Sequence, residues 1–336
     1  MSSTVEIQSH IGRTWIPARA GQPAPLATPF TVAELTSAHG PLALEARSAL
    51  RARPGFAAAV RTTARGTLAL HQGNRLLNLI INDRGRYMVG LMAVDLHFNR
   101  DAAGVGLTPG RLRRRCAETG TCSPARASAL LTLMRLGDFV GSGPSVQDRR
   151  RRELVPTERL ISAHQNRWKC QFEASAPLLT EAAHALAAVE EPHFVPAMAQ
   201  LQCAYYDAGL RVLDLAPALR IFGERAGGMF VVLALIGAAD DDALVNGAPV
   251  NISISELARR IGSSRTHVIK LLNDAAADGL VDRSSGNGIV LLPRLSEAVH
   301  EFFAIGYLFL AHCAKAIREG HLRAPERGRR ASPTRS

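Results

Sequence analysis

Residues that can hydrogen-bond to bases recur at helical spacing near position 265. Over 265–277, Arg265, Thr266, Ile269 and Lys270 fall on one side of an expected helix, and apolar residues such as Leu271 fall on the other. The planar fork of an arginine can bond O6 and N7 of a guanine together, which discriminates between bases by about 1–3 kcal/mol. This outer face therefore predicts contacts with the bases of double-stranded DNA.

The neighbouring sequence predicts how this helix is held. A short amphipathic helix is expected over 255–261, Gly262 ends it, and Ser263 or Ser264 can cap the helix that follows. Asp-Gly-Leu-Val at 278–281 closes the second helix, and a glycine-rich turn between two short strands reaches position 292. Two helices joined by a tight turn can place the second in the major groove, with the hairpin beside it as a wing.

This order resembles the winged helix-turn-helix of bacterial regulators, and Ser264-Arg265-Thr266-x-x-x-Lys270 is similar to the reading helix of the catabolite-activator type. The resemblance implies base contacts from Arg265, Thr266, Ile269 and Lys270, and contacts with the DNA backbone from Ser264, His267 and Arg283. An architectural unit that contacts only proteins is the alternative. The surrounding stretch 176–316 favours it to some degree, because ten basic residues there face fifteen acidic ones.

The first half of the chain repeats the same order at low identity. Leu107-Thr108-x-x-x-Leu112-x-x-x-Cys116 matches the spacing of 252–261, and 130–140 parallels 271–281. Leu154-Val155-Pro156 is matched with Leu291-Leu292-Pro293, and a long helix follows each. About four more residues separate the two helices of this first unit, and Ser123-Pro124 resembles a cap followed by a first-turn proline.

The first unit has weaker base-reading residues and more arginine than the second. Proline and alanine replace Arg265 and Lys270, which leaves Ser128 and Thr132 as candidates for base contacts. Arginines crowd the first helix of the pair and the expected wing, and arginines in a wing favour contact with phosphates or the minor groove. The candidate backbone contacts are Arg113, Arg114, Arg126, Arg149, Arg150, Arg151 and Arg152.

Helix, helix-turn-helix, Asp-Arg-rich wing and long terminal helix together resemble the MarR (multiple antibiotic resistance regulator) family. Its wing commonly carries Asp-x-Arg and then Leu-x-Leu-Thr, and here Asp148-Arg149-Arg150 precedes Leu154-Val155-Pro156-Thr157. The members of that family are homodimers with one winged helix per chain. Two units in one chain therefore imply a covalent pseudo-dimer that acts as a monomer, or a homodimer, with 158–188 and 294–317 as association helices and an asymmetric DNA site.

We therefore predict a mainly α fold with two winged helix-turn-helix domains, small β-hairpin wings and long linking helices. The expected parts are a flexible N-terminal segment (1–55), a first winged-helix domain (56–190), a second (191–317) and a basic disordered tail (318–336). The formal net charge of +11 suggests an anionic partner. The excess of basic residues lies in 1–175 and in the tail, where they outnumber acidic residues by thirty to fourteen.

Patterns for other chemistry are missing from the sequence. No dinucleotide or Walker phosphate loop, nucleophile elbow or HExxH zinc motif occurs, and the five scattered cysteines include no CxxC pair. We expect no enzyme, no cofactor and no metal site. Cys122, beside the cap of the first reading helix, is a candidate redox sensor.

These observations leave one leading hypothesis and several alternatives. The leading one is a cytoplasmic regulator, a repressor, that binds double-stranded DNA and no membrane, because the longest apolar runs are too short to span a bilayer. A small-molecule effector is a further candidate partner. The alternatives are a plasmid-type replication initiator, a winged-helix scaffold that contacts proteins and not DNA, and an enzyme with winged helices as accessory domains.

Overall fold

Helices dominate this chain. The computed structural model describes residues 28–72, 78, 83–143, 153–240, 248–283 and 288–320. Within these ranges the strands have two or three residues each, and nearly all other regular structure is helical. The abundance of Ala, Leu and Arg, which are strong helix formers, accounts for this composition, and the expected mainly α fold is confirmed.

The second half of the chain builds one unit in a continuous order. Its elements are α13 (Gly228–Ala238), β3 (Pro249–Val250), α15 (Ile254–Ile261), α16 (Arg265–Ala277), β4 (Val281–Asp282), β5 (Ile289–Leu291) and α17 (Pro293–Arg318). The strands pair antiparallel in the order β3-β5-β4. Ile289 and Leu291 are buried while Val290 between them is half-buried, so one face of β5 packs on the helices.

The first half repeats that order. Its elements are α5 (Arg84–Phe98), α6 (Pro109–Glu118), α7 (Pro124–Leu136), β1 (Val140–Ser142), β2 (Leu154–Pro156) and α8 (Glu158–Ser175). β1 and β2 pair antiparallel. The amide of Leu154 donates to the carbonyl of Leu107 at 2.8 Å. This contact occupies the place that the pairing of β3 with β5 has in the second half. Asp138 and Gly279, which end the turns after α7 and α16, both have positive φ (56° and 66°), a conformation that Asp tolerates.

The strand register corrects one detail of the sequence match. Val140 lies opposite Pro156 in the first half, and Val281 lies opposite Leu291 in the second. Pro156 therefore corresponds to Leu291, and the match with Pro293 is wrong by two residues. The two prolines occupy different positions. Pro156 is the last residue of β2, whereas Pro293 is the first residue of α17. The first residues of a helix have no partner for their backbone N–H, so the missing N–H of proline costs no hydrogen bond there.

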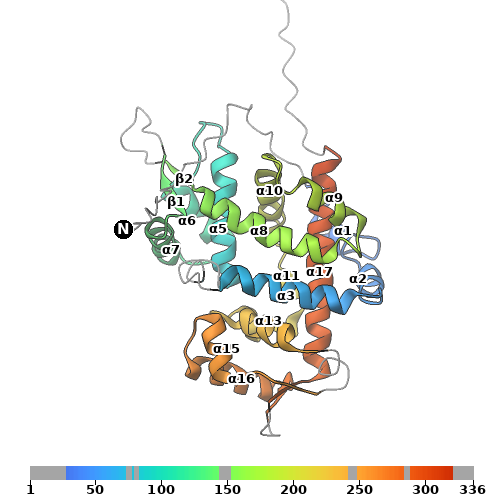
Figure 1. Ribbon diagram of the computed structural model, residues 1–336. Coiled ribbons are helices and arrows are strands. Elements are labelled where there is room, and N and C mark those ends of the chain that lie inside the picture. Colours follow the sequence, from blue (N-terminus) through green and yellow to red (C-terminus); the bar gives the residue numbers. More distant parts are fainter. Residues whose placement is uncertain are drawn as a thin grey trace, which may run out of the picture.

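Each half packs on a helix that precedes the other half. Helix α3 (Phe56–His71) comes before the first unit but packs along α13 and α8, and α10 (Phe194–Asp207) comes before the second unit but packs along α5 and α17. Figure 1 shows α3 lying across the molecule between α8 and the second unit. One buried cluster accordingly joins Ala59 and Val60 to Phe230, and the other joins Met198 to Met92. The predicted boundary at residue 190 does not separate the two cores.

The remaining helical segments are short, and several of them contact α17. They are α1 (Val32–Thr36), α2 (Leu44–Arg51), α9 (Thr180–Ala188), α11 (Val212–Leu215), the 3-10 turn η1 (Pro217–Leu219) and α12 (Arg220–Gly223). Residues 28–55 thus differ from the flexible segment expected there, because Leu35, Leu42 and Leu50 are buried and Arg47 forms an ion pair with Glu301 of α17. The segment is rich in Pro, Ala and Gly, and this composition made the three buried leucines and the ion pair of Arg47 hard to predict.

Among the described residues no single helix is long and apolar enough to cross a membrane. The segments Pro217–Gly223 and Gly228–Ala238 are together long and apolar enough to cross a membrane, but they meet at an angle of 110°.

Candidate nucleic-acid interface

Local sequence explains the helix pair of the second unit. Ser253 caps α15 by accepting the amide of Glu256, and Ser264 caps α16 by accepting the amide of His267 at 3.2 Å. Gly262 ends α15 with φ of 66°, a backbone region that other residues rarely adopt. Leu257, Ile261, Val268 and Leu271 are buried where the two helices meet. The prediction of two helices joined by a glycine turn is confirmed at the level of secondary structure.

The outer face of α16 carries polar side chains directed to solvent. Arg265, Thr266, Lys270 and Asn273 are exposed, and Ile269 is half-buried between them. No hydrogen bond or ion pair of the Arg265 side chain occurs within the described part of the chain. Nζ of Lys270 lies 3.6 Å from a carboxylate oxygen of Asp274. The Lys270 side chain is exposed, so it can readily leave Asp274 for another anion. The amino end of a helix also carries partial positive charge, which suits a phosphate nearby.

Three predicted backbone contacts of the second unit are placed differently from one another. Ser264 is exposed, but its hydroxyl is engaged in the cap. A ring nitrogen of His267 lies 2.9 Å from the carbonyl oxygen of Ala226, so the ring faces the chain before α13. Arg283 donates to the side-chain oxygen of Asn273, which docks the end of β4 onto α16. Of these three, Ser264 alone keeps an exposed side chain.

The matching helix of the first unit presents a different surface. The hydroxyl of Ser128 donates to the carbonyl of Pro124 at 3.0 Å, and the hydroxyl of Thr132 donates to that of Ser128 at 3.1 Å. Leu133 and Leu136 are 36% and 77% exposed on the same helix. Both predicted base-reading hydroxyls of α7 therefore bond within their own helix, beside exposed leucines.

The arginines of α6 divide into two groups. Arg113 and Arg114 are exposed, and the nearest carboxylate to Arg114 is that of Glu118, at 4.0 Å. Arg111 instead donates to the carbonyls of Val105 and Gly106, and Arg115 lies between two carboxylates. Arg126, predicted to contact the DNA backbone, is 54% exposed and pairs with Asp83 at 3.1 Å. Of the four arginines on α6, Arg111 and Arg115 thus make contacts within the protein.

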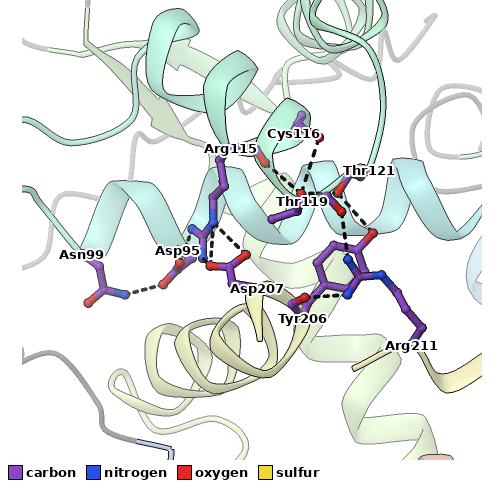
Figure 2. A network of polar contacts seen from close by, with 9 residues as sticks. All are labelled: Asp95, Asn99, Arg115, Cys116, Thr119, Thr121, Tyr206, Asp207 and Arg211. Atoms are coloured by element: carbon purple, nitrogen blue, oxygen red, sulfur yellow. Dashed lines mark hydrogen bonds and ion pairs between the residues drawn. The ribbon is translucent and has the colours of Figure 1, made fainter. Parts of the chain in front are cut away.

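A polar network that sequence reasoning missed attaches α6 and the segment that precedes α7 to α10 (Figure 2). Arg115 reaches Asp95 of α5 and Asp207 of α10, and Arg211 donates to the carbonyl of Thr119 at 2.8 Å. Thr121 donates to the phenol oxygen of Tyr206 at 3.1 Å. These contacts hold the segment between α6 and α7 against the end of α10, which belongs in sequence to the other half of the chain.

Some predicted residues lie outside this description. Arg149, Arg150, Arg151 and Arg152, which were expected in the wing of the first unit, fall in 144–152, which is not among the described residues. Cys122 is half-buried, and burial raises the pKa of its thiol, with a smaller opposing effect from Cys116. A raised pKa disfavours the thiolate that a redox sensor needs. In the described ranges, no three His, Cys, Asp or Glu side chains are grouped closely enough to hold a metal ion.

Comparison with known proteins gave no relative: no family model, no curated protein and no solved structure matches this chain.

Proposed function

We propose that this chain is a sequence-specific regulator that binds double-stranded DNA through two winged helix-turn-helix units. The observation that carries the proposal is the outer face of α16, where Arg265, Thr266 and Lys270 are exposed on a helix that α15 and a short sheet hold from behind. Arginine and lysine can bond guanine in the major groove. A helix after a tight turn, with a hairpin on its far side, is a common way to present such a face to DNA.

The two units divide the work of binding unequally. The second supplies base contacts through α16. The first supplies phosphate contacts through Arg113 and Arg114 of α6 and the arginines of its wing, because the hydroxyls of α7 are engaged within their helix. One chain thus binds an asymmetric site, and it represses transcription by occupying that site.

Selection of bound duplexes from a random pool tests this proposal. The selected duplex and a scrambled one are then titrated with the full-length protein at about 50, 100 and 200 mM salt. We expect one asymmetric motif, a preference for the selected duplex, and affinity that falls steeply as salt rises. Recovery of two identical inverted half-sites bound by one chain would contradict the unequal pair.

A scaffold that contacts proteins is the second candidate, and one feature favours it. Leu133 and Leu136 are exposed on α7, the helix that would otherwise read DNA in the first unit. This candidate predicts no salt-dependent affinity for any duplex, so the same titration separates the two functions.

A further inference from the structure

Helix α7 of the first unit carries an apolar stripe on its outer side. The residues of this stripe are Ala125, Ala129, Thr132, Leu133 and Leu136. They recur every three or four positions, which places them on one face of the helix, and the buried residues of α7 lie on the opposite face. All of the stripe is exposed, with Leu133 at 36% and Leu136 at 77%. The stripe therefore belongs to the surface of the protein and not to its core.

The stripe offers no spare hydroxyl donor. The hydroxyl of Thr132 donates to the carbonyl of Ser128 at 3.1 Å, and the hydroxyl of Ser128, beside the stripe, donates to the carbonyl of Pro124 at 3.0 Å. A hydroxyl carries one hydrogen, so neither group can donate to a second acceptor while these bonds persist. Methyl and methylene groups are what the stripe presents to a partner.

Arginines flank this stripe. Arg126 and Arg135 lie on its two sides, and both are exposed. Arg113 and Arg114 on the preceding helix, α6, are exposed as well. The carboxylate of Asp138 follows the last turn of α7, beyond the end of the stripe. The outer face of α7 therefore has an apolar centre and basic edges.

The major groove of DNA is complementary to both features of this face. Phosphates line the two edges of the groove, and an α-helix fits between them. The apolar group in the floor of the groove is the C5-methyl group of thymine. A second copy of the chain is less complementary, because a two-fold contact would bring the arginine edges of two α7 helices together.

We propose that α7 recognises the C5-methyl groups of thymine, so that the first unit selects a half-site rich in T·A pairs. This inference rests on the proposed DNA binding and adds a specificity to its first unit. Helix α16 bonds the donors and acceptors of bases, whereas the stripe of α7 packs on methyl groups while the flanking arginines contact phosphates.

Sensitivity to cytosine methylation follows from the same contact. A methyl group at C5 of cytosine occupies the position in the major groove that the methyl group of thymine has. The stripe of α7 gains its apolar contact from either base, because it makes no hydrogen bond that would distinguish them. Methylation of a C·G pair in this half-site therefore strengthens binding.

Replacement of thymidine by deoxyuridine tests the proposal directly. Deoxyuridine lacks the C5-methyl group and pairs with adenine in the same way. The full-length protein is titrated with the selected duplex and with versions in which one thymidine at a time is replaced. We expect binding about fourfold weaker for each contacted methyl group, the value of one buried methylene group, and no change at thymidines outside the motif. Equal affinity for all versions would overturn the proposal.

A variant of the stripe assigns the effect to α7. Leu133→Gln with Leu136→Gln keeps a good helix former at two exposed positions, so the melting temperature should not change. This variant should bind the thymidine and deoxyuridine versions equally. Leu44→Gln makes the same change at a leucine of α2 that is 64% exposed, and the fourfold difference should remain. A retained difference in the α7 variant would assign the methyl contact to another helix and overturn the proposal.

Addition of a methyl group provides the reciprocal measurement. A sensitive T·A pair is changed to C·G, with or without a methyl group at C5 of the cytosine. We expect the methylated duplex to be bound about fourfold more tightly by the parent protein and equally by the α7 variant. Equal binding of the two duplexes by the parent would overturn the proposal.

The failure of this inference is distinguishable from that of the proposed function. No affinity for any duplex would overturn both. Selection of a motif with the expected dependence on salt, but without a methyl effect, would overturn only the role of α7. The exposed leucines would then be assigned to contact with a protein partner.

Discussion

Arg115 and Asp207 lie 92 residues apart in the chain, and their side chains form an ion pair with 2.6 Å between nitrogen and oxygen. Arg115 also contacts Asp95, whose side chain is only 6% exposed. The first helix pair is therefore attached by charge to α10, the helix that precedes the second unit. Disturbing this attachment should change the stability of the whole molecule.

The two ends of this network should differ in cost. Arg115→Met leaves the buried carboxylate of Asp95 without its cation, and we expect it to lower the free energy of unfolding by about 3 kcal/mol. Asp207→Asn removes a carboxylate whose side chain is 38% exposed, and we expect it to lower the free energy of unfolding by about 1 kcal/mol. Urea unfolding of both variants checks the order, and an equal cost would show that Asp95 does not depend on Arg115.

Helix α3 packs on the second unit and α10 on the first, so we predict that neither half of the chain folds alone. A fragment covering 191–336 lacks α3, and so loses the burial of Phe56 and Val60 against the second unit. That loss alone is about 3–6 kcal/mol, comparable to the whole stability of a domain, about 5–15 kcal/mol. We expect low helicity and no cooperative thermal transition by circular dichroism. Coexpression with 1–190 should restore both, whereas cooperative unfolding of the single fragment would contradict this prediction.

The stability of the protein should fall as the pH drops below 6.5, in part because of His164. Its ring is fully buried, neither nitrogen has a hydrogen-bond partner in the described structure, and burial lowers its pKa to about 3. Below pH 6.5 the unfolded chain binds a proton here that the folded chain does not. The folded state therefore loses about 1.4 kcal/mol per pH unit, or about 2 kcal/mol between pH 6.5 and 5.

His164→Leu isolates this contribution. We expect the difference in unfolding free energy between pH 6.5 and 5 to shrink by about 2 kcal/mol, with little change at pH 8, because a neutral apolar side chain replaces a neutral ring. Urea unfolding at the three pH values measures it. The same pH slope in variant and parent would mean that His164 is protonated in the folded protein.

Arg265 should contribute sequence preference. Arg265→Ala is expected to weaken binding to the selected duplex by about 1–3 kcal/mol and to relax preference at one base pair, because a bidentate contact with guanine is lost. Arg318→Ala, at the far end of α17, removes the same charge and should leave the preference unchanged (Figure 1). An equal loss on every duplex would remove Arg265 from the base-reading residues.

The arginines of the first unit should contribute general affinity. We expect Arg113→Gln with Arg114→Gln to weaken binding to all duplexes about equally, and to lower the slope of log affinity against log salt by about one for each phosphate contact removed. The wing variant in which Arg149 to Arg152 become glutamine should act the same way. Filter binding over a range of salt concentrations measures both, and an unchanged slope would show that these side chains do not meet phosphates.

Much of the local structure could be read directly from the residues. The caps Ser123 and Ser264, the glycine that ends α15 and the bounds of α16 follow from preferences acting within a few positions. The repeated order of elements was also visible in the spacing of apolar residues. The register of the second strands was missed by two residues, because the prolines at 156 and 293 look alike in sequence and serve different elements.

The sequence by itself determined where α16 begins and ends and which of its faces is polar, since these depend on neighbours a turn away. Only the tertiary structure decided that α3 packs on the second unit and α10 on the first, and that Arg115 forms ion pairs within the fold while Arg113 is exposed. Such outcomes depend on contacts between residues far apart in the chain. Many helix packings bury similar apolar area, and local preference does not choose among them.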